Sequence, residues 1–138
     1  MKVFQFKLKN NNDNSEISTP IYIKNNRKQQ TEKGNAVWDT GATSSMISAI
    51  MAKKLQLVPI GTAQIAGVHG IKNTKCYLID IIFQNGFIIE NVKVSEASDF
   101  GGFDLLVGMD IIGKGILLIN GINGEMKVLF QFPIDSSN

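Results

Sequence analysis

Residues 36–48 of the chain read AVWDTGATSSMIS. A short apolar strand, residues 36–38, leads into Asp39, and a small hydroxyl residue and a glycine follow it. This order places a carboxylate on a tight turn beside backbone N–H groups, where it can act as a catalytic acid or base. An aspartate in an isolated turn more often bonds its own backbone. Other stretches of the sequence are therefore needed to choose between these two interpretations.

Two further stretches bear on this choice. Residues 62–83 carry a β pattern that Gly67 and Gly70 divide, which predicts a glycine-bearing hairpin. Within this region, residues 63–81 read AQIAGVHGIKNTKCYLIDI. Residues 103–112 read FDLLVGMDII, an apolar run that ends at a glycine and a short helical pattern. Both stretches follow the Asp-Thr-Gly in the chain.

The remaining segments are mostly strand-like. Alternation of apolar and polar residues predicts a strand over residues 2–9, and residues 20–24, rich in Ile and Tyr, predict a second. The polar run 25–35 is expected to be a loop. Residues 45–57 carry apolar side chains at spacings of three and four behind a serine cap, which predicts a helix. Further strands are expected at residues 87–94, 116–120 and 126–132, and residues 103–107 form an apolar run.

Composition excludes several classes of function. The chain has 138 residues with one cysteine and one histidine, so it cannot form an intrachain disulfide or a Cys/His zinc site. A formal net charge of +2 is too small to predict nucleic-acid binding as the main function. We expect a single domain over residues 1–138, in which residues 1–19 form an N-terminal strand and a polar segment.

Neither an export signal nor a membrane span is predicted. The amino terminus alternates apolar and polar residues, and residues 103–119 are interrupted by three charged side chains. A cytoplasmic protein without membrane insertion is expected. Residues 108–115 are similar to a phosphate-binding loop, but Gly115 stands where a serine or threonine would hold magnesium. Residues 11–16 lack the glycine of a calcium loop, so neither a metal nor another cofactor is expected.

Together, the three stretches resemble the retropepsin-like aspartic proteases. Residues 36–48 are similar to the active-site motif of that family, residues 63–81 look like its flap hairpin, and residues 103–112 are similar to the segment beneath its catalytic loop. The resemblance covers about residues 20–132. It implies a mostly-β, closed-barrel fold with a flap hairpin in residues 62–83 and one or two short helices. It also implies an aspartic endopeptidase, which hydrolyses peptide bonds.

The resemblance assigns a role to each matching position. Asp39 would be the catalytic residue. Thr40 would join the active-site loops of two subunits by reciprocal hydrogen bonds, and Gly41 would leave room for a substrate backbone. The residues implied to support the catalytic loop are Thr40, Gly41, Ala42, Leu106, Val107 and Gly108. The flap residues implied to close over the substrate are Gly67, Val68, His69 and Gly70.

The number of motifs predicts the oligomeric state. Peptide hydrolysis by this chemistry uses two facing carboxylates that share one proton and hold a water molecule between them. The chain contains one Asp-Thr-Gly, and no other aspartate precedes Ser-Gly or Thr-Gly. A homodimer is therefore predicted, in which the Asp39 residues of the two subunits meet at a two-fold axis. Lys2–Leu8 and Val128–Phe132 are the expected interface strands, and an extended peptide or protein is the expected substrate.

The chain departs from the family pattern at several positions. Many retroviral members carry an aspartate at the position of Thr43 and an arginine at that of Met109, and these two groups pair. That ion pair is absent from this sequence. His69 replaces a usual glycine at the flap tip. Cys76 is expected to be buried as a small apolar side chain.

The alternative to an enzyme is a non-catalytic homodimeric interaction or scaffolding domain with the same fold. An intact Asp-Thr-Gly together with the flap glycines favours catalysis, because a purely structural domain has no physical need to keep Asp39 beside a flap.

Overall fold

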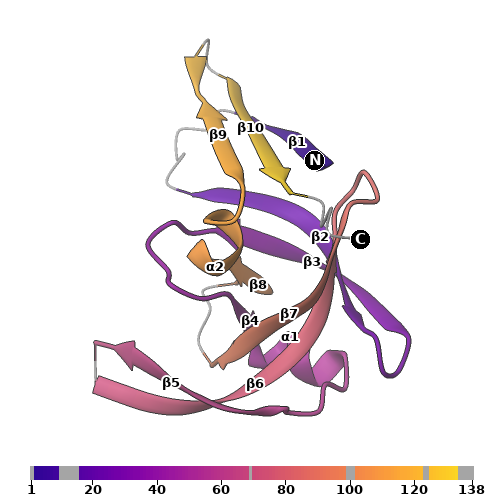
Figure 1. The fold of residues 1–138 in the computed structure, drawn as a ribbon, viewed down its shortest axis with the longest axis vertical. Helices are drawn as coiled ribbons and strands as arrows, with labels where there is room; N and C mark the ends of the chain where they lie inside the picture. The colour runs from indigo at the N-terminus through magenta and orange to yellow at the C-terminus, as the bar shows by residue number, and fades with distance from the viewer. Residues whose placement is uncertain (1, 10–15, 69, 99–101, 123–124, 134–138) are drawn as a thin grey trace.

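The computed structural model describes residues 2–9, 16–68, 70–98, 102–122 and 125–133 (Figure 1). Strands make up most of this part of the chain, as the alternating sequence pattern predicts. The strands are β1 (Lys2–Lys9), β2 (Ile17–Asn25), β3 (Gln30–Trp38), β4 (Met46–Ser48), β5 (Gly61–Gly67), β6 (Gly70–Ile82), β7 (Ile88–Ala97), β8 (Leu105–Val107), β9 (Ile116–Asn120) and β10 (Glu125–Phe132). The helices are α1 (Ala49–Lys54) and α2 (Met109–Ile112).

Six strands close into a barrel. Their order is β2-β3-β8-β4-β7-β6, and β6 pairs again with β2 to complete the ring. Strand β5 lies outside the ring, where it pairs with β6 to form a projecting hairpin. The closed, mostly-β barrel with two short helices that was expected from the sequence is confirmed.

The interior of the barrel is packed mainly with branched aliphatic side chains, to which β3 adds Ala36 and Trp38. Each fully buried Ile or Leu contributes roughly 1.5–3 kcal/mol through the removal of apolar surface from water. The aliphatic residues with no more than 1 % exposure include Ile21, Ile23, Ile47, Ile79, Ile81, Leu105 and Val107. Cys76 is fully buried as well, as expected.

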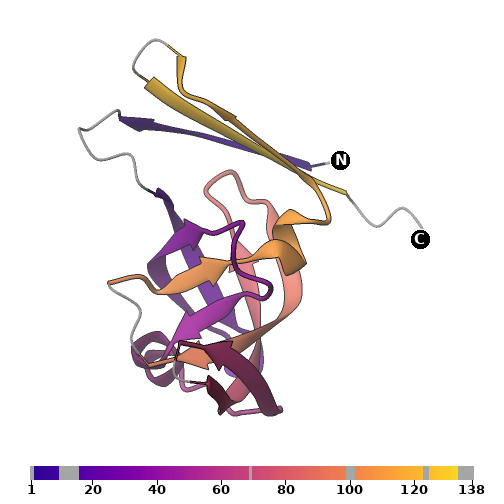
Figure 2. The same cartoon turned by 90° about the vertical axis from the view of Figure 1, so that its left-hand side faces the viewer.

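A second sheet, in the order β1-β10-β9, covers one end of the barrel (Figure 2). Aromatic rings join the two parts. The ring centroid of Trp38 in the barrel lies 5.0 Å from that of Phe130 in the second sheet and 6.0 Å from that of Phe83, directly after β6. The indole Nε1 of Trp38 donates to Thr19 Oγ1 at 3.0 Å, so this buried donor is satisfied. Because Trp38 directly precedes Asp39, this cluster anchors the end of β3 that carries the aspartate.

The predicted helix over residues 45–57 is shorter in the structure. Residues 46–48 form β4 instead, because Met46 and Ile47 pair with β8 and with β7. The helix α1 begins after Ser48, whose hydroxyl accepts a hydrogen bond from Met51 N at 3.0 Å and so caps the first turn. No helix in the described part of the chain is long and apolar enough to cross a membrane.

The prediction of a loop over residues 25–35 is wrong. The chain turns tightly after Asn25, and β3 already begins at Gln30. The two strands pair in register from Ile17 opposite Trp38 to Asn25 opposite Gln30. Residues 30–35 are polar and yet pair with β2 along their whole length, which explains why their polarity concealed the strand.

Candidate active site

Strand β8 positions the Asp-Thr-Gly loop, because it lies between β3 and β4 in the barrel. It pairs in parallel with β3, where Trp38 lies opposite Val107, and antiparallel with β4. Asp39 N donates to Val107 O at 2.9 Å, which extends this ladder by one residue. The aspartate therefore emerges from the sheet at a point held by two neighbouring strands.

The loop that follows β3 turns tightly around the aspartate side chain. Gly41 N donates to Asp39 Oδ1 at 2.8 Å, and Ala42 N donates to Asp39 O at 3.2 Å. Asp39 is half-buried, whereas Thr40 and Gly41 are exposed. A Cβ at Gly41 would lie 3.2 Å from Asp39 Oδ1, tighter than ordinary contacts. The carboxylate thus makes the backbone bond of a turn aspartate and is still accessible to solvent.

Gly108 packs directly beneath this loop. Met109 N donates to Ala42 O at 2.8 Å. A Cβ at Gly108 would lie 2.9 Å from Ala42 O and from the backbone of Ser44, so a side chain would displace the loop. The structure therefore brings Val107 and Gly108 against the Asp-Thr-Gly loop, and Leu106 lies beside Val37 and Met46 on the neighbouring strands.

Ser45 and Asp110 join the loop to α2, and the sequence reasoning missed this contact. The Ser45 hydroxyl donates to Asp110 Oδ1 at 2.7 Å and accepts from Gly108 N at 3.0 Å. Ser45 N donates to Asp110 Oδ2 at 2.9 Å. Ser45 is completely buried. These bonds connect the Asp39 loop to α2. Many retroviral members would join the same two segments by an ion pair at the positions of Thr43 and Met109.

The β5–β6 hairpin supplies the second group of predicted site residues. Gly67 lies opposite Gly70, and Gly70 has a φ of +102°, in the region that favours glycine. Val68 at the turn is 98 % exposed. His69 lies outside the described residues. In Figure 1, the ends of β5 and β6 that project from the barrel and the loop from β3 to β4 lie on the same, left-hand side of the molecule.

A hydrogen bond at the base of the hairpin joins β6 to β7. Tyr77 Oη donates to Glu96 Oε1 at 2.7 Å, and Tyr77 is buried. Burial raises the pKa of Tyr77 to about 12, and the hydrogen bond to Glu96 and its negative charge add to this effect. The folded state therefore holds the Tyr77 proton more firmly than the unfolded chain does.

This shift predicts a loss of stability at high pH. The unfolded chain releases the tyrosine proton near pH 10, so the free energy of unfolding should fall between pH 10 and about 12, by about 2–3 kcal/mol. Urea unfolding of the wild type and of Tyr77→Phe at a series of pH values checks this. Relative to that of Tyr77→Phe, the free energy of unfolding of the wild type should fall by that amount between pH 10 and about 12. Parallel pH profiles of the two proteins would contradict it.

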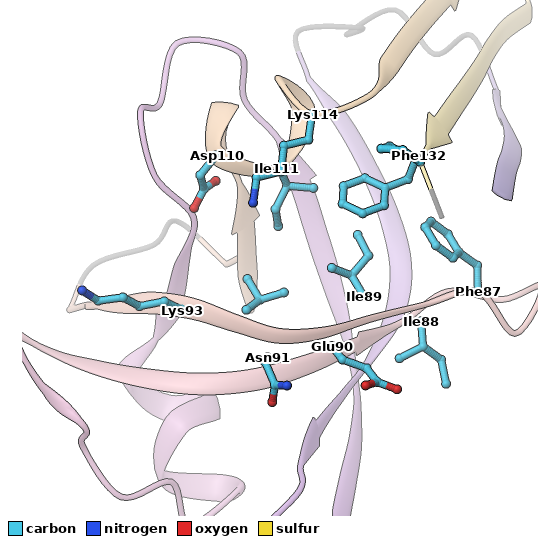
Figure 3. A pocket seen from close by; sticks show the side chains of 12 residues that line it. Phe87, Ile88, Ile89, Glu90, Asn91, Lys93, Asp110, Ile111, Lys114 and Phe132 are labelled. Atoms are coloured by element: carbon cyan, nitrogen blue, oxygen red, sulfur yellow. The ribbon is translucent and has the colours of Figure 1, made fainter. Parts of the chain in front are cut away.

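A separate cavity of about 860 Å³ lies between β7, α2 and the end of β10 (Figure 3). Its wall includes Asp110 and Ile111 of α2, with Phe87 and Phe132 on its other side (Figure 3). Asp39, Thr40 and Gly41 do not line it. This cavity therefore borders α2, which is hydrogen-bonded to the Asp39 loop, and not the Asp39 carboxylate itself.

Comparison with protein families agrees with this geometry. Residues 27–114 match the family described as "gag-polyprotein putative aspartyl protease". The match spans more than half of the chain and includes the Asp39 loop, the β5–β6 hairpin and β8. The chain belongs to this family. No curated protein sequence matches this family member significantly.

Solved structures of retropepsin-like proteins share the fold of this aspartyl protease family member. A retropepsin-like aspartic protease from Rickettsia conorii aligns with a TM-score of 0.60 and 15% identity, over 94% of this chain and 92% of that chain. EIAV protease in complex with the inhibitor HBY-793 aligns with a TM-score of 0.53 and 22% identity, over 75% and 90%. The retroviral protease-like domain of Ddi1 from Leishmania major aligns at 0.51 and 14%, over 86% and 96%. These likenesses confirm the retropepsin-like fold.

Proposed function

We propose that this chain is an aspartic endopeptidase that acts as a homodimer, with Asp39 of each subunit as its catalytic residue. The observation that carries the proposal is the Asp39 carboxylate itself. It is half-buried on a loop that backbone hydrogen bonds hold to β8, and it lies on the side of the molecule to which the β5–β6 hairpin projects. A single chain supplies one such carboxylate, so a second copy has to complete the site.

The two carboxylates have different roles in the hydrolysis, one as a base and the other as an acid. One Asp39, ionised, takes a proton from the bound water, whose oxygen attacks the carbonyl carbon of the scissile peptide bond. The other Asp39, protonated, donates a hydrogen bond to the carbonyl oxygen and gives up its proton as a tetrahedral diol forms. The C–N bond then breaks as the departing amine takes the proton held by the first aspartate. One hydroxyl of the diol returns its proton to the second aspartate as the carboxylic acid forms. Close carboxylates share one proton in this way because both cannot readily ionise together.

The neighbouring residues fit the supporting roles in this proposal. Thr40 and Gly41 are exposed, so Thr40 is accessible to a second subunit and Gly41 to a substrate backbone. The hairpin turn with Gly67, Val68 and Gly70 would act as the flap that closes over an extended peptide. Such a peptide gains affinity through its main-chain groups and specificity through alternate side chains.

The terminal sheet supports a dimer but narrows the choice of interface strands. Strand β10 is the central strand, so Val128–Gln131 are paired on both edges within the chain. Open edges remain on β1 and β9 in the described sheet. Ile116, Leu118 and Ile119 of β9 are each about half exposed, at 51 %, 56 % and 48 %. An apolar open edge favours pairing with another chain, and β9 forms the left-hand edge of this sheet in Figure 1.

Digestion of a mixed peptide library at several acidic and neutral pH values tests the proposal. We expect wild-type protein to cleave a subset of peptides and Asp39→Asn protein to cleave none. On serial dilution, specific activity should fall with the dimer fraction measured by sedimentation. A fully active monomer would exclude the shared site, and a stable dimer that cleaves nothing would favour the non-catalytic interaction domain.

A further inference from the structure

Strand β6 has an open edge where it leaves the barrel. It pairs with β7 only as far as Cys76, which lies opposite Ser95. From there β7 turns away and pairs with β4, so that Met46 lies opposite Ser95. Residues 70–75 therefore have β5 on one edge and, in the described part of the chain, no strand on the other.

A cavity of about 810 Å³ follows this open edge. Apolar and polar side chains share its lining, and the residues come from the hairpin, from β4 and from the end of β7. The apolar part includes Met46 and Ile65, and the charged residues of the lining are Lys72, Lys75 and Glu96.

The strand register places Met46 on the face of the sheet that leads to the catalytic loop. Residues directly opposite each other on paired strands share one face of a sheet. Met46 lies opposite Leu106, and Leu106 lies opposite Val37, two residues before Asp39. A peptide that extends from Asp39 along this face would therefore reach the cavity.

Lys72 lies on the same face of the sheet as Met46. Cys76 and Met46 both lie opposite Ser95, so their side chains share one face of the sheet. Lys72 is four residues before Cys76 on β6, and because side chains alternate along a strand, Lys72 lies on that face too. Lys72 also lies opposite Ile65, which is half-buried on the hairpin. Lys75, three residues further along β6, lies on the other face of the strand and also lines the cavity. Both lysines are exposed, as the end of a flexible side chain at a rim would be.

The charge around the cavity is unbalanced. The carboxylate of Glu96 already accepts the Tyr77 hydroxyl at 2.7 Å. In the described part of the chain, the ion pair is between Lys54 and Glu32, away from the cavity, so no carboxylate pairs with either lysine of the rim. Among the described residues of the lining, two ammonium groups without an ion pair and one carboxylate that is already hydrogen-bonded give a net positive charge.

We infer that this protein selects peptides with an acidic side chain directed toward the hairpin, and that Lys72 and Lys75 make the selection. This inference rests on the proposed peptide hydrolysis and names the substrate class of that site. An ion pair at an exposed rim is worth little singly, so two lysines should favour Glu over Gln by about 3- to 10-fold in kcat/KM. Added salt should weaken the preference because it screens exposed charges.

Matched peptides test the inference. Two sets of labelled decapeptides share an apolar frame and carry Glu, Gln or Lys at odd or at even positions, because one set must direct these side chains toward the hairpin. For wild type, we expect one set to rank Glu above Gln above Lys. The variant Lys72→Glu/Lys75→Glu should reverse this order. The control Lys33→Glu/Lys53→Glu makes the same change in net charge at exposed positions outside the cavity and should keep it.

Two readouts separate the selection from the catalysis. Cleavage rates are measured for the three proteins with Asp39 intact. Peptide dissociation constants are measured by fluorescence anisotropy for the same three proteins carrying Asp39→Asn. If no peptide is cleaved but the Glu set still binds more tightly and the rim variant reverses the order, the hydrolysis fails and the selection stands. Equal handling of Glu and Lys peptides, or the same reversal in the Lys33/Lys53 control, would overturn the selection.

Discussion

Cleavage by mixtures of wild-type and Asp39→Asn subunits is expected to fall as the square of the wild-type fraction. An amide can neither take the proton of the water nor share a proton with its partner, so one altered subunit disables the whole site. Catalytic groups that act as a unit are strongly non-additive, and a mixed dimer should resemble the doubly substituted protein. The loss at each mixing ratio should therefore exceed the share of altered subunits.

The experiment mixes the two proteins at known ratios, allows subunit exchange and follows cleavage of one peptide in excess. Asparagine has nearly the shape of aspartate, and the substitution removes like-charge repulsion at the axis, so the dimer should be at least as stable. Glu125→Gln, an equivalent change at an exposed position of β10, serves as the control and should leave activity unchanged at every ratio. A linear fall with Asp39→Asn would mean that each chain carries a complete site.

Ser45→Ala is expected to lower the free energy of unfolding by about 3 kcal/mol. The substitution removes a fully buried hydroxyl that donates to Asp110 and accepts from Gly108 N. Hydrogen bonds to charged groups and buried groups left without a partner each account for about 1–3 kcal/mol. Because these bonds hold the Asp39 loop against α2, turnover should also fall, by about 10- to 100-fold.

Denaturant unfolding and peptide cleavage measure the two effects. The matched control is Ser44→Ala, since Ser44 is the exposed neighbour in the same loop and should change stability by less than about 0.5 kcal/mol. A double-mutant cycle with Asp110→Ala isolates the contact. Coupling of about 1 kcal/mol or more is expected, whereas additive effects of the two substitutions would show that the contact contributes nothing to the loop.

The features with a local cause could be predicted from the sequence. Trp38 and the residues before it are apolar, and the turn residues after Asp39 end the strand, so the carboxylate could be located at a strand end. The turn between Gly67 and Gly70 was predictable because glycine tolerates the positive φ that the hairpin adopts at Gly70. The strand over residues 116–120 was predicted with the bounds that the structure has for β9.

The errors arose where pairing overrode local composition. The polar residues 25–35 form most of β3 because β2 supplies hydrogen bonds along the backbone, whatever the side chains are. Residues 46–48 join the sheet although their spacing suits a helix, because β7 and β8 lie on either side of them. Ile50 is 81 % exposed, because α1 turns Met51 and Ala52 toward the core instead.

The sequence by itself determined that the chain carries one Asp-Thr-Gly, on a tight turn after an apolar strand, and no second copy of this motif. Only the tertiary structure decided what holds that turn in place and which strand edges stay open. Ser45 and Asp110 lie 65 residues apart, and β10 lies between β1 and β9. Such contacts form between segments that are far apart in the sequence and come together only when the barrel closes. A local pattern of residues does not specify them.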